Sequence, residues 1–474
     1  MSESTGRAKT GFKDLKKIFG GGQSDVRQFG ILFSLIAIIA LFQFLTDGLT
    51  LSSGNLINLV SQYSYILILA IGMVMVIIAG HIDLSVGSVA AFVGIVVATS
   101  MNSWHLPWPL AILFGLVVGV LIGAWQGWWV AYVGVPAFIV TLAGMLIFRG
   151  GNQVIGNANT VPVPSGFTTI GAGYLPEIGP NTGYNNLTLL LGLIIAVAVV
   201  VKELRARRVQ QSMGSEQAPL WVSILKVVVL DAVVVYATMA FAGGRTGTSF
   251  PVSGIILGVL VLFYSFVTRN TIFGRHIYAV GGNRLAAELS GVKSKRVNFL
   301  VIMNMSILAA LAGMIFVARS VASGPQDGLG WELDAIAAVF IGGAAVSGGI
   351  GTVTGSIIGG LVMAVLNNGL QLLGVGSDRV QIIKGMVLLL AVGIDVWNKS
   401  QGRPSITGFL MHSRKTVVPA SAGAADEVPR AVRRTPPLPW SPRRSSAMPA
   451  LRLQHQLHPH HTQPQSHSTD WKVT

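Results

Sequence analysis

The stretch QYSYILILAIGMVMVIIAG, residues 62–80, contains no charged side chain. About 20 apolar residues in a helix cross the ~30 Å hydrocarbon core of a bilayer, so this stretch predicts a membrane-spanning helix. Similar apolar stretches lie on both sides of it, at residues 29–46, 86–101, 109–131, 137–149, 186–201, 221–242, 252–268, 299–318, 335–347, 351–373 and 381–397. The sequence therefore predicts an all-α polytopic membrane protein with about ten transmembrane helices and one or two short re-entrant or half helices.

The composition agrees with this fold class. Hydrophobic residues make up 51% of the chain and charged residues 11%, against roughly 25% charged residues in soluble domains. Lys and Arg outnumber Asp and Glu by 33 to 18, but the cations gather between apolar stretches and in the tails. That distribution follows the positive-inside rule and does not indicate nucleic-acid binding. The absence of Cys from the sequence excludes disulfides and thiolate metal sites.

The cations also predict the orientation of the chain, because basic loops stay in the cytoplasm. The expected cytoplasmic segments are residues 1–28, 202–208 and 269–298. The expected outer segments are residues 47–61, 150–185 and 319–334. Counting the crossings between them places both termini in the cytoplasm.

Three regions follow from this pattern. Residues 1–28 form a cytoplasmic N-terminal segment, residues 29–400 form the transmembrane domain, and residues 401–474 form a basic tail rich in Pro and His. The tail lacks an apolar face and is expected to be disordered. Within the domain, 335–347 is short for a span, so we expect a half-helix that turns back within the membrane, covered there by protein.

The loop at residues 269–298 mixes basic residues with a short helix-forming stretch. Leu285 to Ser290 predicts a helix that Gly291 closes as a C-cap. Its small residues, Ala286 and Ala287, permit close approach of another surface. Such a helix docks on a partner protein or lies solvated, and the residues alone leave both interpretations open.

A second feature is Gly80-His81-Ile82-Asp83-Leu84-Ser85-Val86-Gly87-Ser88. An ionised Asp at the bilayer centre costs about 2.5–3.5 kcal/mol, so Asp83 is expected at an interface, in a cavity or beside a partner. It either caps a helix that begins near Leu84 or takes part in transport. His81 is not expected to bind a metal.

Glycines and amides recur at helical spacing. Two glycine series predict smooth helix faces for close packing, and they comprise Gly115, Gly119, Gly123 and Gly127, then Gly351, Gly355 and Gly359. Amides in the apolar stretches hydrogen-bond either the hydroxyls of a passing sugar or a neighbouring helix. With Asp83, the candidates for a translocation pathway are Gln62, Asn304, Asn367, Asn368 and Gln371.

Missing motifs restrict the chemistry of the chain. The sequence contains no Gly-x4-Gly-Lys-Ser/Thr, so any ATP hydrolysis comes from another polypeptide. It also lacks a His-Glu-x2-His pair and a Ser/His/Asp constellation. These absences predict that the chain is not an enzyme and binds neither metal nor cofactor.

Several motifs together resemble the branched-chain/ribose-type permeases of bacterial ABC importers. They are Gly80 to Ser88, Val135 to Met145, Phe148-Arg149-Gly150, Glu332 to Ala338 and Ile341-Gly342-Gly343. The stretch from Gly123 to Tyr132 looks most like xylose and multiple-monosaccharide permeases. The spacing from Leu285 to Gly291 resembles the Glu-Ala-Ala-x3-Gly coupling signature of such permeases, with Leu285 in place of Glu.

The resemblance implies a homodimeric pore in the inner membrane that imports a monosaccharide, xylose or a related aldose. A separate ATPase would carry ATP and Mg²⁺ and dock on residues 283–292. The implied coupling residues are Asn283, Leu285, Ala286, Ala287 and Gly291. An extracytoplasmic protein would deliver the sugar, which the permease sequence does not specify. An ion-coupled secondary sugar carrier and a membrane-embedded enzyme are the alternative functions.

Overall fold

The structure is a computed structural model that describes residues 23–180, 182–213, 219–244 and 247–400. The first half of this chain contains α2 (Gln23–Leu45), η1 (Leu49–Leu51), α3 (Ser53–Ile78), α4 (Val86–Ser103), α5 (Trp108–Trp128), the π-helical turn η2 (Trp129–Val133), α6 (Ala137–Ile155), β1 (Val161–Pro162) and α7 (Ser165–Ala172). The second half contains α8 (Asn186–Ser212), α9 (Leu220–Ala242), α10 (Val252–Asn270), α11 (Ile272–Gly282), α12 (Arg284–Leu289), α13 (Ser294–Ser320), β2 (Ala322–Ser323), α14 (Trp331–Ile341), α15 (Val353–Leu372) and α16 (Ser377–Ser400).

The helices confirm the predicted all-α polytopic class. Among the described residues, nine helices are long and apolar enough to cross a membrane, namely α3, α4, α5 with η2, α6, α8, α9, α10, α13 and α15. Helix α2 adds the shorter apolar stretch Gly30–Leu45. Every apolar stretch predicted from the sequence overlaps one helix. The predicted segments 1–22 and 401–474 lie outside the described residues.

The protein core forms around α3, α4 and α13. Helix α13 packs against α3, α4 and α5, and Ile68, Met73 and Met305 are among the side chains that are completely buried there. In the apolar window of α3, 83% of the residues are buried, whereas the corresponding share in α8 and α9 is 11%. Helices α8 and α9 therefore leave most of their apolar surface to the lipid.

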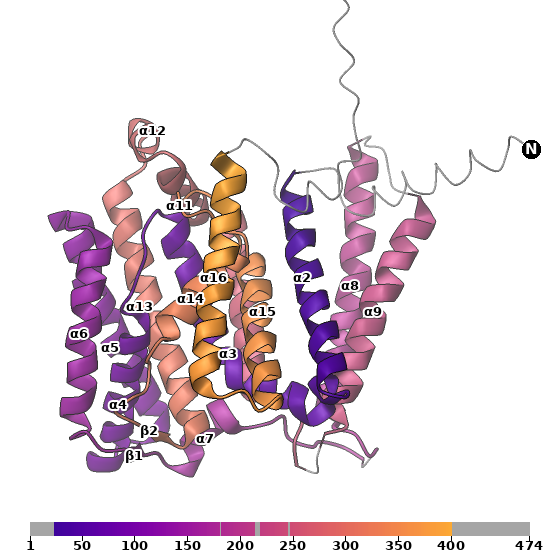
Figure 1. Ribbon diagram of the computed structural model, residues 1–474, viewed down its shortest axis with the longest axis horizontal. Coiled ribbons are helices and arrows are strands. Elements are labelled where there is room, and N and C mark those ends of the chain that lie inside the picture. Colours follow the sequence, from indigo (N-terminus) through magenta and orange to yellow (C-terminus); the bar gives the residue numbers. More distant parts are fainter. Residues whose placement is uncertain (1–22, 181, 214–218, 245–246, 401–474) are drawn as a thin grey trace, which may run out of the picture. The chain divides into compact units, whose positions relative to one another are not determined.

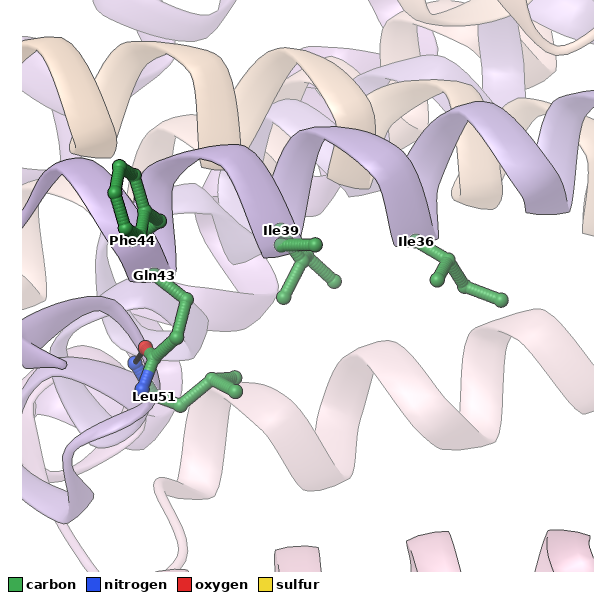
Figure 2. A pocket seen from close by; sticks show the side chains of 6 residues that line it. Ile36, Ile39, Gln43, Phe44 and Leu51 are labelled. Atoms are coloured by element: carbon green, nitrogen blue, oxygen red, sulfur yellow. Dashed lines mark hydrogen bonds between the residues drawn. The ribbon is translucent and has the colours of Figure 1, made fainter.

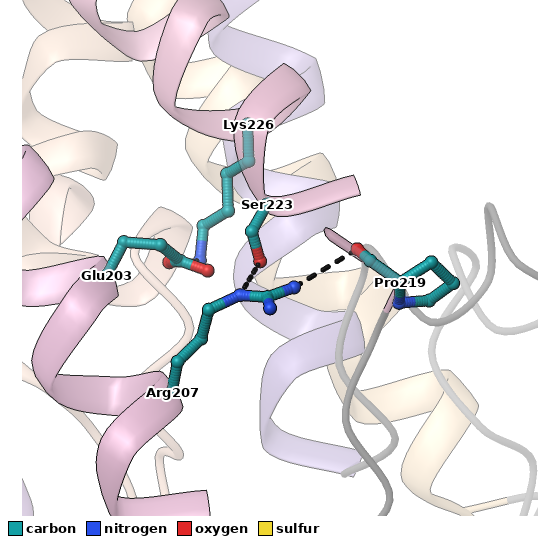
Figure 3. A network of polar contacts seen from close by, with 5 residues as sticks. All are labelled: Glu203, Arg207, Pro219, Ser223 and Lys226. Carbon is teal, nitrogen blue, oxygen red and sulfur yellow. Dashed lines mark hydrogen bonds and ion pairs between the residues drawn. The ribbon is translucent and has the colours of Figure 1, made fainter. Parts of the chain in front are cut away.

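Polar contacts fasten α8 to α9 near their connection (Figure 3). Lys226 Nζ lies 2.9 Å from Glu203 Oε2. Arg207 Nε donates to Ser223 Oγ at 2.8 Å, and Arg207 Nη2 donates to the Pro219 carbonyl oxygen at 3.1 Å. Because charged residues are costly in lipid unless paired, these contacts join the two helices into one hairpin.

Helix α14 is the short helix predicted within 335–347, although it begins and ends earlier than expected. It has 11 residues, from Trp331 to Ile341, which rise only about 16 Å. Irregular backbone follows, and Gly349 N donates to the Ile78 carbonyl oxygen at 2.8 Å. The backbone after α14 therefore contacts the C-terminal end of α3. Contacts with α3 and α11 cover this irregular backbone, and they supply the protein cover that we expected there.

Two ends of the helix bundle are distinguished by their short elements (Figure 1). Helices α11 and α12 lie at one end. Strands β1 and β2 pair antiparallel at the other end, with Val161 opposite Ser323, and α7 packs on α13 there. The predicted cytoplasmic loop 269–298 and the predicted outer segments 150–185 and 319–334 therefore lie at opposite ends.

Candidate functional site

Helix α12 is the short helix predicted in the 269–298 loop, and its own residues close both of its ends. At the first end, Ala286 N donates to Asn283 Oδ1 at 3.0 Å. At the other end, Gly291 has a φ of 86°, and the Gly291 and Val292 amides donate to the Glu288 and Ala287 carbonyl oxygens at 2.9 and 3.0 Å. This pairing is a Schellman cap, which favours glycine at the left-handed position.

The sides of α12 differ in exposure. Ala287 is buried, whereas Leu285 and Leu289 are 68% and 82% exposed. Ala287 holds the helix against the rest of the protein, and both leucines point away from it. The geometry leaves an exposed apolar surface of the kind that a partner protein covers.

A hydroxyl contact links α12 to the start of α13, and an ion pair lies within α12. Ser294 Oγ donates to Glu288 Oε1, and Arg284 Nε lies 2.9 Å from the same oxygen. Ser294 and then Arg284 hold the pKa of Glu288 below its ordinary value, because both favour the ionised carboxylate. The carboxylate is therefore charged at neutral pH and links α12 to α13.

Behind α12, glycine contacts bring α11 onto the core. A Cβ added to Gly281 would collide with the Ile78 carbonyl oxygen, and a Cβ on Gly349 would lie 2.8 Å from Gly282 Cα. Tyr278 of α11 also donates to the Gly351 carbonyl oxygen at 2.8 Å. We call Ile78, Gly281 and Gly349 the glycine junction. It places the segment bearing α12 in direct contact with α3 and with the backbone after α14.

Asp83 lies in the irregular segment between α3 and α4 and is completely buried. Its Oδ1 accepts from Ser85 N at 2.8 Å and from Ser85 Oγ at 2.7 Å. Gln126 Nε2 of α5 donates to the same hydroxyl at 2.9 Å. The helix begins at Val86 with Ser85 at its N-cap, so the predicted capping of a helix at Leu84 by Asp83 is wrong. The side chain stabilises the turn before the helix instead.

A cavity of ≈ 440 Å³ lies between this segment and α12. It is lined by His81, by residues 130–138 and by Arg284, Lys295 and Asn298. Burial lowers the pKa of His81, and the positive charge of Arg284 acts in the same direction. Residues of the 269–298 loop and of the segment that precedes Asp83 therefore line the same polar cavity.

The predicted pathway amides do not converge on one cavity among the described residues. Asn368 and Asn55 exchange hydrogen bonds at 2.8 and 2.9 Å, and Asn304 Oδ1 accepts from Tyr264 at 2.6 Å. Such pairs favour the interhelical interpretation for these two residues. The half-buried Asn367 side chain lies against the Tyr63 hydroxyl. Gln62 is half-buried on α3, and Gln371 is exposed on α15.

The glycine series lie where helices approach most closely. A Cβ on Gly119 would stand 2.6 Å from Ala310 Cβ, and one on Gly123 would stand 2.7 Å from Met303 Cα. Gly127 meets α13 at Phe299, and Gly115 meets both α4 at Val97 and α13 at Met314. Gly359 meets the backbone of α14 at Ala338, and Gly355 meets the backbone of Gly342 directly after that helix. Gly351 does not share their helix face, because α15 begins at Val353; it lies in the preceding loop, against Ile78.

An open groove of ≈ 500 Å³ runs along α2 (Figure 2). Ile36, Ile39, Phe44 and Leu51 supply apolar surface to it. Gln43 is its polar residue, and Gln43 Oε1 already accepts from Leu51 N at 2.9 Å. A groove of this composition suits an acyl chain or an apolar helix and not a polyhydroxylated solute.

The comparisons with known proteins decide between the classes of membrane protein. The family model described as branched-chain amino acid transport system / permease component matches residues 55–392. The chain belongs to this permease family. The protein is therefore a transport subunit and not an enzyme, and it resides in the inner membrane with several spans. Its partners as a permease of this type are an ATPase and a substrate-binding protein.

Curated relatives cover most of the chain. A protein named xylose transport system permease protein XylH from Haemophilus influenzae is 41% identical over 78% of this chain and 96% of its own length. The XylH of Escherichia coli K12 is 40% identical over 81% of this chain and 94% of its own. The ribose import permease protein RbsC of Escherichia coli K12 is 35% identical over 78% of this permease and 93% of the relative. No solved structure matches the chain.

Sequence reasoning overlooked several residues that hold the site together. Ser85 joins Asp83 to Gln126, Ser294 binds Glu288, and Lys384 pairs with Asp334. A lysine in the apolar stretch 381–397 was a signal for the last of these, because such a charge requires a partner. The two serines carried no comparable signal, since serine is common in membrane helices.

Proposed function

We propose that this permease imports xylose or a closely related aldose, driven by ATP. The observation that carries the proposal is the greater identity to the two XylH proteins, 41% and 40%, than to RbsC, 35%, over similar lengths. Xylose is the solute in the printed names of the first two relatives. A polyhydroxylated pentose also suits helices that carry amides such as Asn367.

In this proposal α12 is the docking element for the ATPase. The exposed Leu285 and Leu289 enter a groove of the ATPase, and Asn283 and Gly291 fix the ends of the helix that the ATPase moves. ATP and Mg²⁺ bind on that subunit, and this chain binds no cofactor. The end that carries α12 faces the cytoplasm, as do both termini. The substrate-binding protein docks at the opposite end of a homodimer.

Reconstitution tests the solute and the energy source together. The permease is placed in liposomes with its ATPase and a xylose-binding protein, and uptake of labelled xylose and ribose is compared. We expect xylose uptake to require ATP and to saturate at a lower sugar concentration than ribose uptake does. Equal uptake of both sugars, or uptake without ATP, contradicts the proposal.

Variants of α12 test the docking assignment. Deletion of residues 285–291, or Gly291→Asp, is expected to abolish ATP-dependent uptake while the protein still inserts into the membrane. Gly282→Ala in the same loop is the matched control, because no atom lies within 4 Å of an added Cβ there, and it is expected to retain uptake. Normal uptake by the deletion variant removes the docking role from this helix.

A further inference from the structure

An ion pair joins the short helix α14 to α16 in apolar surroundings. Lys384 Nζ lies 2.5 Å from Asp334 Oδ1, and each side chain is 20% exposed. Exposed apolar residues of α16 lie near Lys384, namely Ile382, Met386 and Leu389, and Gln381 is the exposed polar residue one turn before it. A single charge on such a helix is strongly disfavoured in lipid, so each of the two residues requires the other.

Other contacts fix both ends of α14. Trp331 packs against Tyr65 and Phe316 with ring centroids 4.5 Å apart in each pair. At the other end, the backbone after α14 reaches the glycine junction, where Gly349 N donates to the Ile78 carbonyl oxygen. Helix α14 therefore lies between the ion pair and the segment that carries α12. A displacement of α11 at the junction acts on a helix whose first turn Lys384 holds.

An ion pair between α14 and α16 has a property that an apolar contact between them would lack. Two apolar side chains of similar size hold helices together at least as well as a shielded ion pair, so stability does not explain the charges. Two paired charges fix one geometry of the helices. When the helices move, each charged side chain can bind another polar group instead. Tyr63 and Tyr65 of α3 lie near the Asp334 carboxyl group, and the Tyr63 hydroxyl adjoins Asn367 of α15.

We propose that the Asp334–Lys384 pair positions α14 so that movement of the α11–α12 segment changes the packing of α14 against α3 and α15. The pair then determines how much sugar crosses for each ATP hydrolysed. This inference rests on the proposed ATP-driven import. Asp334 and Lys384 act as positioning residues, since neither needs to touch the sugar.

The test compares a neutral pair with a reversed pair in the reconstituted transporter. Asp334→Asn with Lys384→Gln removes both charges, and Asp334→Lys with Lys384→Asp exchanges them. We expect both variants to assemble with the ATPase. The neutral variant should hydrolyse ATP, but the amount of xylose moved per ATP should fall by about fivefold or more. The reversed pair should restore the ratio of xylose moved to ATP hydrolysed to at least half of its value in the unmodified transporter.

Each outcome has one interpretation. A neutral variant with an unchanged ratio of xylose to ATP shows that the pair does not position α14. A neutral variant that fails to assemble shows that the pair only maintains structure, and it overturns the inference as well. A reversed-pair variant that assembles but does not restore the ratio of xylose to ATP also overturns the inference. If the unmodified transporter moves no sugar with ATP, the proposed function fails and not the role of the pair.

Discussion

Gly281 and Gly282 are neighbours that have opposite surroundings. A methyl group on Gly281 would collide with the Ile78 carbonyl oxygen, whereas no atom lies within 4 Å of a Cβ on Gly282. Overpacking typically costs about 1–3 kcal/mol. We expect Gly281→Ala to lower the thermal unfolding temperature of the purified protein and to reduce ATP-driven uptake. Gly282→Ala is the control and should match the unmodified protein in both measurements. Equal behaviour of the two variants contradicts a tight glycine junction.

Gly291 is constrained by its backbone and not by its neighbours. Its φ is 86°, and a Cβ there would meet nothing within 4 Å. The left-handed conformation costs an ordinary L residue about 1–2 kcal/mol, while asparagine adopts it more readily. Gly291→Val should therefore weaken the cap of α12 and reduce ATPase binding severalfold, and Gly291→Asn should have a smaller effect. Binding of the purified ATPase to each variant in nanodiscs measures this difference, and equal affinities would show that the cap is dispensable.

At the scale of elements, α5 depends on its smooth face against α13. Gly123 faces Met303 and Ser306 of α13, whereas Val120 is 38% exposed on α5. Gly123→Leu is expected to separate the two helices and to reduce the folded yield in the membrane by more than half, because the closest atom is backbone. Val120→Leu adds volume on the exposed side and should leave the yield unchanged. Size-exclusion profiles of both variants provide the measurement. A monodisperse Gly123→Leu protein would refute the packing role.

An element could be predicted from the sequence where local interactions form it, and could not where contacts distant in sequence form it. Long helices such as α13 were predictable because transfer of 20 apolar residues into lipid is a local property. Helix α12 was predictable because Gly291 carries its own conformational signal. The path of residues 342–352 and the position of Gly351 depend on contacts with Ile78 and Tyr278, which lie far away in sequence. The partners of Asn304 and Asn368 were hidden for the same reason.

The whole molecule is organised by the separation of its two ends. Helices α11 and α12, with Arg284 and Lys295 near the cavity, lie at one end, and the β1–β2 pair and α7 lie at the other. Several helices connect the ends, and at the first end the glycine junction joins α11 to α3 and to the backbone after α14. In the proposed mechanism the permease receives force at its polar end, and the packing of α3, α14 and α15 changes in between. The proposal therefore requires that the α12 end face the ATPase.

Cysteine accessibility tests this orientation directly, because the natural sequence contains no Cys and every introduced thiol is unique. Arg205, Lys293 and Thr160 are exposed, the first two in segments expected in the cytoplasm and the third in an expected outer segment. In right-side-out vesicles, a membrane-impermeant maleimide should label Thr160→Cys and leave Arg205→Cys and Lys293→Cys unmodified. In inside-out vesicles the pattern should reverse, because the charged reagent does not cross the hydrocarbon core. Labelling of Lys293→Cys in right-side-out vesicles would place α12 on the side without ATP, where it would have no ATPase to bind.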